Sequence, residues 1–130
     1  MSRSVSAISL LVPDYHAGIA FYVGKLGFSL VEDTPLDDGK RRVLVSPDNG
    51  AQTRLLLARA ADSAQQAAIG NQAGGRVFLF LKTDDFDADH ERFTAAGVRF
   101  LEAPRDEAYG KVAVFENPFG NKWDLIQNRS

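Results

Sequence analysis

The sequence predicts an α+β fold of two βαβββ modules in tandem, within one domain of 130 residues. One apolar strand, one amphipathic helix and three short strands occur in the same order twice. Markers of the two copies recur at a nearly constant spacing. They are 71 residues apart for Asp14 and Asp85, and 70 for Gly27 and Gly97 and for Gly50 and Gly120. Several markers in one order indicate a duplicated unit.

The first module covers about residues 1–58. Its first strand is the apolar run from Val5 to Val12, which ends at Pro13, and Asp14 follows as a helix N-cap. A helix is predicted from Tyr15 to Leu26, because apolar residues recur there at helical spacing. These residues are Ile19, Tyr22, Val23 and Leu26. Three strands bounded by turn residues follow, at 28–33, 41–46 and 53–58.

The second module covers about residues 76–130, after an Ala/Gln-rich stretch, about 59–75, that we interpret as a linker. Its first strand is predicted at 76–82, and Asp84 and Asp85 offer a cap for the second helix. One face of that helix is marked by Phe86, His90, Phe93 and Gly97. The remaining strands are predicted at 98–102, 110–116 and 122–127.

The composition excludes several kinds of active site and disfavours several kinds of partner. The chain has no cysteine and two histidines, His16 and His90, which excludes thiol nucleophiles and Cys-based metal sites and disfavours a histidine-rich metal centre. Its net charge of −2, without a block of like charges, disfavours nucleic acid and anionic membranes as partners. No apolar stretch is as long as a signal peptide core or a membrane span, so we expect a cytoplasmic protein.

Several motifs resemble the vicinal oxygen chelate superfamily, which includes glyoxalase I, bleomycin-resistance proteins, fosfomycin-resistance enzymes and extradiol dioxygenases. In the first half they are Val12-Pro13-Asp14, Phe21-Tyr22 and Leu26-Gly27-Phe28. In the second half they are Thr83-Asp84-Asp85-Phe86-Asp87, Ala95-Ala96-Gly97-Val98 and the segment from Phe115 to Leu125. The resemblance implies a mixed sheet curled around a central cavity, commonly completed by a homodimer. It leaves the function open, because isomerases, oxygenases, transferases and pure binders share this scaffold.

In metal-dependent members, four strand positions supply His, Gln or Glu to one divalent ion. The resemblance places these positions at Ala7, Leu56, Phe78 and Asp124, with Arg54 as the next choice for the second. Only Asp124 carries a ligand atom, whereas an open catalytic site usually needs three protein ligands. Both histidines fall on helices, which cover the outer face of the sheet in this fold. We therefore expect no metal cofactor.

Strand alternation then selects the residues that face the predicted cavity. They are Ala7, Ser9, Leu11, Arg76, Phe78, Phe80, Lys122, Asp124 and Ile126, with Trp123 on the opposite, core face. We interpret Arg54, Arg76, Phe78, Phe80, Tyr109 and Asp124 as candidate ligand-binding residues. The alternative for Phe78 and Phe80 is that their rings simply fill the cavity.

Asp124 and Tyr109 are the catalytic candidates. A carboxylate in an apolar cavity is costly unless it is paired, so Arg54 or Arg76 could pair with Asp124 or bind an anionic ligand. Asp124 could orient a ligand or act as a general base, or it could be a relic of a metal site held in a salt bridge. Tyr109 precedes a predicted strand, where its phenol could reach a ligand at the cavity mouth or pack at the rim. The cluster Lys40-Arg41-Arg42 could attract an anion or mark a solvated strand end.

The sequence thus predicts a metal-free protein that binds a small organic molecule, as a homodimer. One alternative is a metal-dependent lyase of the lactoylglutathione lyase type, or an extradiol dioxygenase, with atypical ligands. A second alternative is a metal-free acid–base enzyme that uses Asp124.

Overall fold

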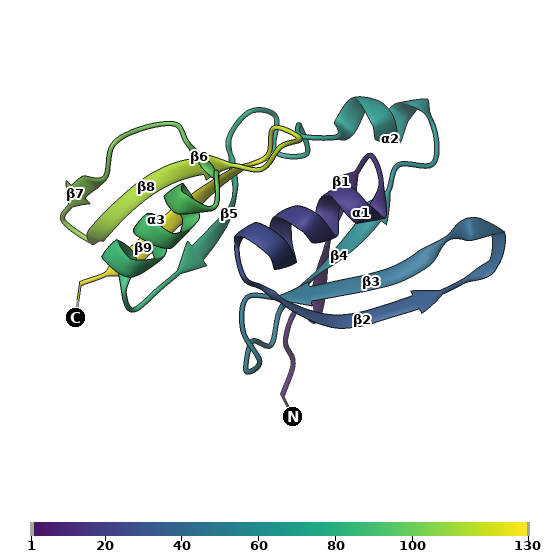
Figure 1. Ribbon diagram of the computed structural model, residues 1–130, viewed down its shortest axis with the longest axis horizontal. Coiled ribbons are helices and arrows are strands. Elements are labelled where there is room, and N and C mark those ends of the chain that lie inside the picture. The colour runs from purple at the N-terminus through teal and green to yellow at the C-terminus, as the bar shows by residue number, and fades with distance from the viewer. Residues whose placement is uncertain (1, 130) are drawn as a thin grey trace. The chain divides into compact units, whose positions relative to one another are not determined.

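The computed structural model describes residues 2–129. It confirms the α+β class and the two tandem modules. The chain divides into two compact units, residues 1–69 and 70–130, and each unit contains its own mixed sheet. In Figure 1, α1 lies across one face of the first sheet and α3 across one face of the second.

The first unit has a four-stranded sheet with the order β1-β4-β3-β2. Its strands are β1 (Ala7–Val12), β2 (Ser29–Pro35), β3 (Arg41–Ser46) and β4 (Arg54–Arg59). β1 and β4 are parallel, and the other neighbours are antiparallel. A 3-10 turn, η2 (Asp37–Gly39), joins β2 to β3. The strand predicted at 41–46 is confirmed to the residue.

The first helix begins as predicted but does not continue as one regular α-helix. The Asp14 carboxylate accepts a hydrogen bond from Ala17 N at 2.7 Å, and α1 covers Tyr15–Ile19. A π-helical segment, η1 (Ala20–Lys25), follows. Its wider turn buries Phe21 next to Tyr22, although the predicted stripe included only Tyr22. The 3.6-residue period was therefore wrong for this segment.

A short helix, α2 (Ser63–Ala68), lies within the stretch interpreted as a linker. Asp62 caps this helix, because its carboxylate accepts a hydrogen bond from Gln65 N at 2.8 Å. Alanine and glutamine are strong helix formers, which explains a helix in this stretch. Residues up to Ile69 belong to the first compact unit.

The second unit has a five-stranded sheet in which β5, β9, β8 and β6 lie in that order and β7 also pairs with β8. Its elements are β5 (Val77–Lys82), α3 (Phe86–Ala95), β6 (Arg99–Phe100), β7 (Arg105–Glu107), β8 (Gly110–Glu116) and β9 (Lys122–Asn128). β5 and β9 are parallel. The Asp85 carboxylate caps α3 by accepting a hydrogen bond from Ala88 N. None of the helices within residues 2–129 is long and apolar enough to cross a membrane.

The strand predicted at 98–102 is only two residues long, and β7 was not predicted. β6 ends early because the Glu102 carboxylate accepts the hydrogen bond of Val114 N at 3.0 Å. The Glu102 side chain thus takes the place of the backbone carbonyl with which a neighbouring strand would pair with Val114. The chain then returns to β8 as β7, with Arg105 opposite Val112.

The core of the second unit is aromatic. The Phe115 and Trp123 rings stack with centroids 5.9 Å apart, and Phe93 approaches Phe115 at 5.8 Å. Trp123 is 3% exposed, so it lies in the core as predicted. The His90 ring stacks on Phe86 and contacts Phe100 at a tilt, so it is part of the packing of α3 against the sheet.

Candidate functional site

In the first unit, the sheet face away from α1 carries two of the predicted metal positions. Ala7 pairs with Arg54 and Ser9 with Leu56 in the parallel β1–β4 ladder, so these residues share one face. The neighbouring residues on the other face are buried: Leu10 and Leu57 are 0% exposed. The predicted alternation of these strands is confirmed. Their open face presents small and apolar side chains, and Arg54 is exposed at its end.

In the second unit, Asp124 lies in the middle of the sheet on β9. Its neighbours across the two ladders are Phe80 on β5 and Val114 on β8. Trp123 and Leu125, on either side of Asp124, are buried in the core, so Asp124 points to the open face. Phe80 is 65% exposed on this face, which we call the Asp124 face: Phe80, Glu102, Arg105, Glu107, Val114 and Asp124.

Phe78 lies at an irregularity of β5. The register between β5 and β9 shifts between Val77 and Leu79, which leaves Phe78 without a partner residue on β9. A bulge of this kind redirects the local side chain. The simple alternation that placed Phe78 beside Phe80 therefore does not extend through this point.

The Asp124 carboxylate is electrostatically unusual. Within residues 2–129, its Oδ1 is buried and has no hydrogen-bond partner. Burial raises the pKa of Asp124 above its ordinary value of 3.8, and the nearby Glu102 carboxylate adds to this, while the Arg105 guanidinium opposes it. A lone buried carboxylate oxygen carries a desolvation cost that a donor group would relieve.

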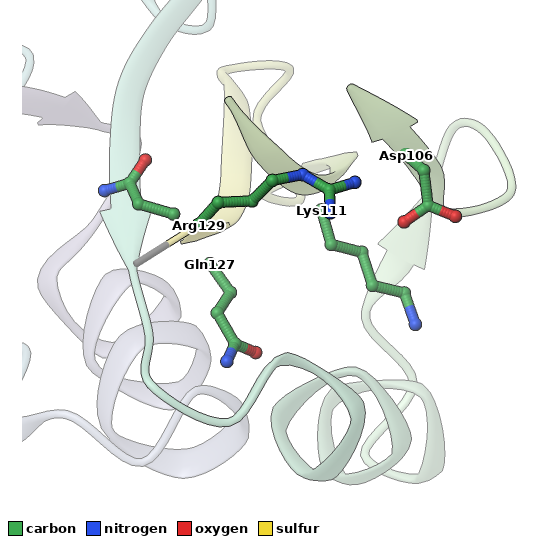
Figure 2. A pocket seen from close by; sticks show the side chains of 5 residues that line it. Asp106, Lys111, Gln127 and Arg129 are labelled. Atoms are coloured by element: carbon green, nitrogen blue, oxygen red, sulfur yellow. The ribbon is translucent and has the colours of Figure 1, made fainter. Parts of the chain in front are cut away.

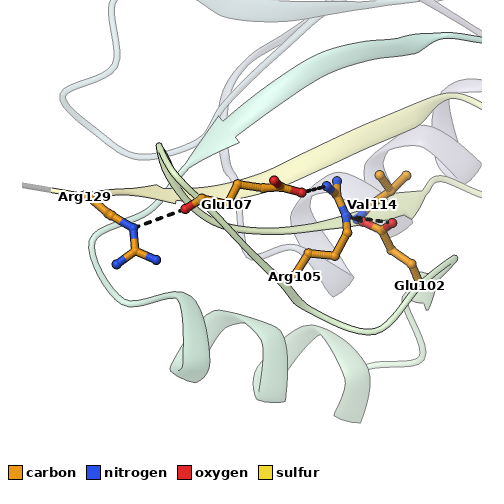
Figure 3. A network of polar contacts seen from close by, with 5 residues as sticks. All are labelled: Glu102, Arg105, Glu107, Val114 and Arg129. Carbon is orange, nitrogen blue, oxygen red and sulfur yellow. Dashed lines mark hydrogen bonds and ion pairs between the residues drawn. The ribbon is translucent and has the colours of Figure 1, made fainter.

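The charge of Arg105 lowers the pKa of Asp124, but Arg105 donates no hydrogen bond to Oδ1, because its guanidinium contacts two other carboxylates (Figure 3). Its Nε lies 2.9 Å from the Glu102 carboxylate, and its Nη1 lies 2.5 Å from that of Glu107. These two contacts raise the pKa of Arg105. Glu102 also accepts the Val114 N–H, and the Glu107 carbonyl accepts a hydrogen bond from Arg129 Nε. The network holds one cation between two anions beside Asp124.

The sequence does not predict this network. Residues 103–109 have no apolar alternation, so they are indistinguishable from a loop. The available signal was the spacing of Arg105 and Glu107, two residues apart, which puts opposite charges on one face of a strand. Recognising this signal requires knowing that the segment is extended, and only its pairing with β8 makes it so.

The other candidate residues are exposed. Arg54 and Arg76 are both exposed, and neither takes part in the ion pairs found among the described residues. Tyr109 is 54% exposed in the turn between β7 and β8, where its carbonyl accepts a hydrogen bond from Arg129 N. His16 is exposed on α1.

A hollow of about 450 Å³ lies at one end of the second unit (Figure 2). Its lining residues are Asp106, Lys111, Gln127, Asn128 and Arg129, and the side chains of Lys111, Gln127 and Arg129 have partners within the fold. Lys111 Nζ contacts the Asp87 carboxylate at 2.6 Å, and Gln127 Oε1 accepts a hydrogen bond from Phe86 N at 2.8 Å. These two contacts join α3 to the sheet, so Lys111 and Gln127 have structural roles.

Comparison with known proteins identifies the family. Residues 4–125 match the Glyoxalase/Bleomycin resistance protein/Dioxygenase superfamily. The chain belongs to this superfamily. It is 52% identical over 128 residues to an uncharacterised protein of Shewanella frigidimarina (strain NCIMB 400), covering 98% of this chain and 95% of that protein.

Two crystal structures of similar proteins share the fold of this superfamily member. One is that of TnmS3, an antibiotic binding protein from Streptomyces sp. CB03234, with a TM-score of 0.79 and 32% identity over 98% of both chains. The other is that of UcmS2, with a TM-score of 0.84 and 26% identity, covering 97% of this chain and 98% of UcmS2.

The metal positions implied by the superfamily do not fit a divalent ion in this chain. The methyl of Ala7, the isobutyl of Leu56 and the benzyl of Phe78 have no donor atoms, which leaves the carboxylate of Asp124 alone. In the part of the chain that the structure describes, no three His, Asp or Glu side chains gather where they could hold a metal. The donor chemistry therefore disagrees with the metal-dependent members.

The raised pKa of Asp124 predicts a pH-dependent stability change in Asp124→Asn. A raised pKa means that the folded state binds the proton more tightly, so stability falls as pH rises from about 3.8 through the folded-state pKa. The amide of Asp124→Asn does not titrate, so this variant does not lose stability in this way as pH rises. We expect the variant to be about 1 kcal/mol more stable than the parent at pH 7, with a smaller difference at pH 4.

Urea unfolding at pH 4, 5, 6 and 7 measures this difference. Asp84→Asn, at an exposed position in the turn before α3, is the control for the loss of one negative charge. A stability difference for Asp124→Asn that shrinks as pH rises would contradict the expected burial effect.

Proposed function

We propose that this protein binds a small organic molecule, without a metal, on the Asp124 face of the second unit. The observation that carries the proposal is the buried Asp124 Oδ1, which has no hydrogen-bond partner within residues 2–129, next to the exposed Phe80 ring. The carboxylate can turn about its Cβ–Cγ bond, so a ligand that donates a hydrogen bond to Asp124 from the open face would satisfy this oxygen. Its flat part would cover Phe80 and remove that ring from water.

The charges on this face favour a ligand with a donor or a positive charge. Glu102, Glu107 and Asp124 are acidic, and Arg105 is the cation that lies among them. Because Arg105 is held by Glu102 and Glu107, it is not directed at an incoming anion. An aromatic or other planar molecule that bears an amine or hydroxyl group therefore fits best.

The comparisons support binding as the general role. TnmS3, at 32% identity, is described as an antibiotic binding protein. The hydrocarbon side chains at Ala7, Leu56 and Phe78 support a site that works without a metal. For the same reason, a lyase or dioxygenase that depends on a divalent ion is the weaker alternative.

Three probes with one ring system and different charges test the proposal: tryptamine, tryptophol and indole-3-propionate. We expect tryptamine to bind most tightly and indole-3-propionate least, by calorimetry or amide chemical shifts. Asp124→Asn should weaken tryptamine binding about tenfold. Phe80→Ala should weaken it about fivefold.

Leu30→Ala is the control, because Leu30 is an exposed apolar residue, 44% exposed, that belongs to the first unit and not to the Asp124 face. Removing divalent ions with a chelator should leave binding unchanged. Equal affinity for the three probes, or full affinity in both Asp124→Asn and Phe80→Ala, would overturn the proposed site. A stoichiometric divalent ion that is required for binding would overturn the metal-free proposal.

A second candidate function is acid–base catalysis by Asp124. The raised pKa and the lone buried oxygen suit a carboxylate that accepts a proton from a bound substrate. Tyr109 stays the accompanying candidate in the β7–β8 turn. Asp124→Asn should then abolish turnover and leave substrate binding largely intact. The homodimer and the cytoplasmic location stay predictions from the sequence.

A further inference from the structure

A second hollow lies entirely within the first unit, where two strands separate. The β3–β4 ladder ends at Val43 and Leu57, two residues before it would join Arg41 to Arg59. Figure 1 shows the β2–β3 hairpin bending away from β4 beyond this point. The space between the separated strands is about 510 Å³ and extends to Ala61 and Gln65 at the start of α2.

Three cationic side chains line this hollow: Lys40, Arg41 and Arg59. Two of them lie over the Tyr15 ring: Arg41 Cζ is 5.2 Å from the ring centroid and Arg59 Cζ is 5.4 Å from it. Tyr15 is itself fixed, because it is 7% exposed and its hydroxyl accepts a hydrogen bond from Arg41 N at 3.1 Å. The stacked Arg59 guanidinium is therefore held in place at the edge of the hollow.

Of these three cations, Arg41 is already neutralised. Its guanidinium forms a two-pronged contact with the Asp33 carboxylate at 2.5 and 3.0 Å, which raises the pKa of Arg41 and lowers that of Asp33. Lys40 and Arg59 take part in none of the ion pairs found within residues 2–129. Among residues 2–129, no carboxylate lines the hollow; Asp37 and Asp38 in the adjacent turn are not part of its wall.

We propose that this hollow, here called the Arg59 pocket (Tyr15, Leu36, Lys40, Arg41, Arg59 and Ala60), binds a small organic anion. The anionic group, a carboxylate, sulfonate or phosphate, lies between Arg59 and Lys40, where two charge-assisted contacts are available. The apolar part of the ligand covers Leu36, a leucine that is 51% exposed at the wall. The Arg59 pocket differs in charge from the acidic Asp124 face, so the two sites take different ligands.

Benzoate, phenyl phosphate, benzamide and inorganic phosphate test this proposal with the full chain, by calorimetry and amide chemical shifts. We expect benzoate and phenyl phosphate to bind and to shift the amides of residues 58–61. Benzamide, which lacks the charge, should bind at least tenfold more weakly. Inorganic phosphate should also bind more weakly, because it has no apolar part to cover Leu36.

Arg59→Gln and Lys40→Gln should each weaken benzoate binding about tenfold. Arg42→Gln is the matched control: Arg42 belongs to the same basic cluster but pairs with Glu32 at 3.4 Å and does not line the pocket. All three side chains are exposed, so the variants should keep the parent's thermal unfolding midpoint. An equal loss in Arg42→Gln and Arg59→Gln would overturn the proposal, as would benzamide binding as tightly as benzoate.

Discussion

Phe115→Ala is expected to lower the free energy of unfolding of the second unit by about 3–5 kcal/mol. Phe115 is 0% exposed on β8, and its ring touches three other aromatic rings. The centroids of Phe93, Phe100 and Trp123 lie 5.8, 5.6 and 5.9 Å from it. Removing the ring leaves a cavity between α3 and the sheet that rigid strands cannot collapse to fill.

Trp123 provides the readout for this prediction. It is the one tryptophan of the chain and stacks directly on Phe115, so its fluorescence during urea unfolding follows the second unit. Phe80→Ala is the matched control, because Phe80 is 65% exposed on the open face and should cost about 0.5 kcal/mol or less. A loss below about 1 kcal/mol in Phe115→Ala would show that this cluster is not the core of the unit.

Gly70→Ala is expected to destabilise the protein by about 3 kcal/mol. Gly70 has φ +74°, and a Cβ atom at this position would lie 1.9 Å from the carbonyl oxygen of Phe119. That carbonyl belongs to the β8–β9 turn, which cannot easily move. Asn117 Oδ1 accepts hydrogen bonds from Phe119 N and Asn121 N there, at 3.0 and 2.9 Å.

Gly74→Ala is the control that measures the cost of the positive φ angle without a steric clash. Gly74 has φ +65°, but a Cβ atom there would meet no atom of residues 2–129 within 4 Å. Gly74→Ala should therefore lower the free energy of unfolding only through backbone strain, by about 1 kcal/mol. Thermal unfolding of the two variants side by side gives the comparison, and equal midpoints would rule out a close approach of Gly70 to the turn.

Local patterns were enough to predict most of the fold. The strands Arg41–Ser46 and Gly110–Glu116 are where alternation and turn residues place them. Asp14 and Asp85 cap their helices because their carboxylates reach backbone N–H groups only three residues ahead. The π-helical turn after Ile19 departs from the expected 3.6-residue period, and Phe21 is buried there as well as Tyr22.

The sequence was enough to predict the place of Asp124 in the candidate site but not its charged neighbours. Asp124 was placed on the open face by alternation, since its neighbours Trp123 and Leu125 are both buried. Its expected partners, Arg54 and Arg76, are exposed and form none of the ion pairs seen in residues 2–129, whereas the cation near Asp124 is Arg105. Arg105 reaches that place because β7 pairs with β8, which no local pattern indicates.

The sequence by itself determined the duplicated βαβββ order, the superfamily and the lack of metal-donor atoms in the side chains of Ala7, Leu56 and Phe78, because each depends on residue type and spacing along the chain. Only the tertiary structure decided which charges surround Asp124 and where Lys40 and Arg59 form a pocket. Strand pairing brings distant residues together, and a carboxylate's pKa or a cation's availability depends on neighbours in space.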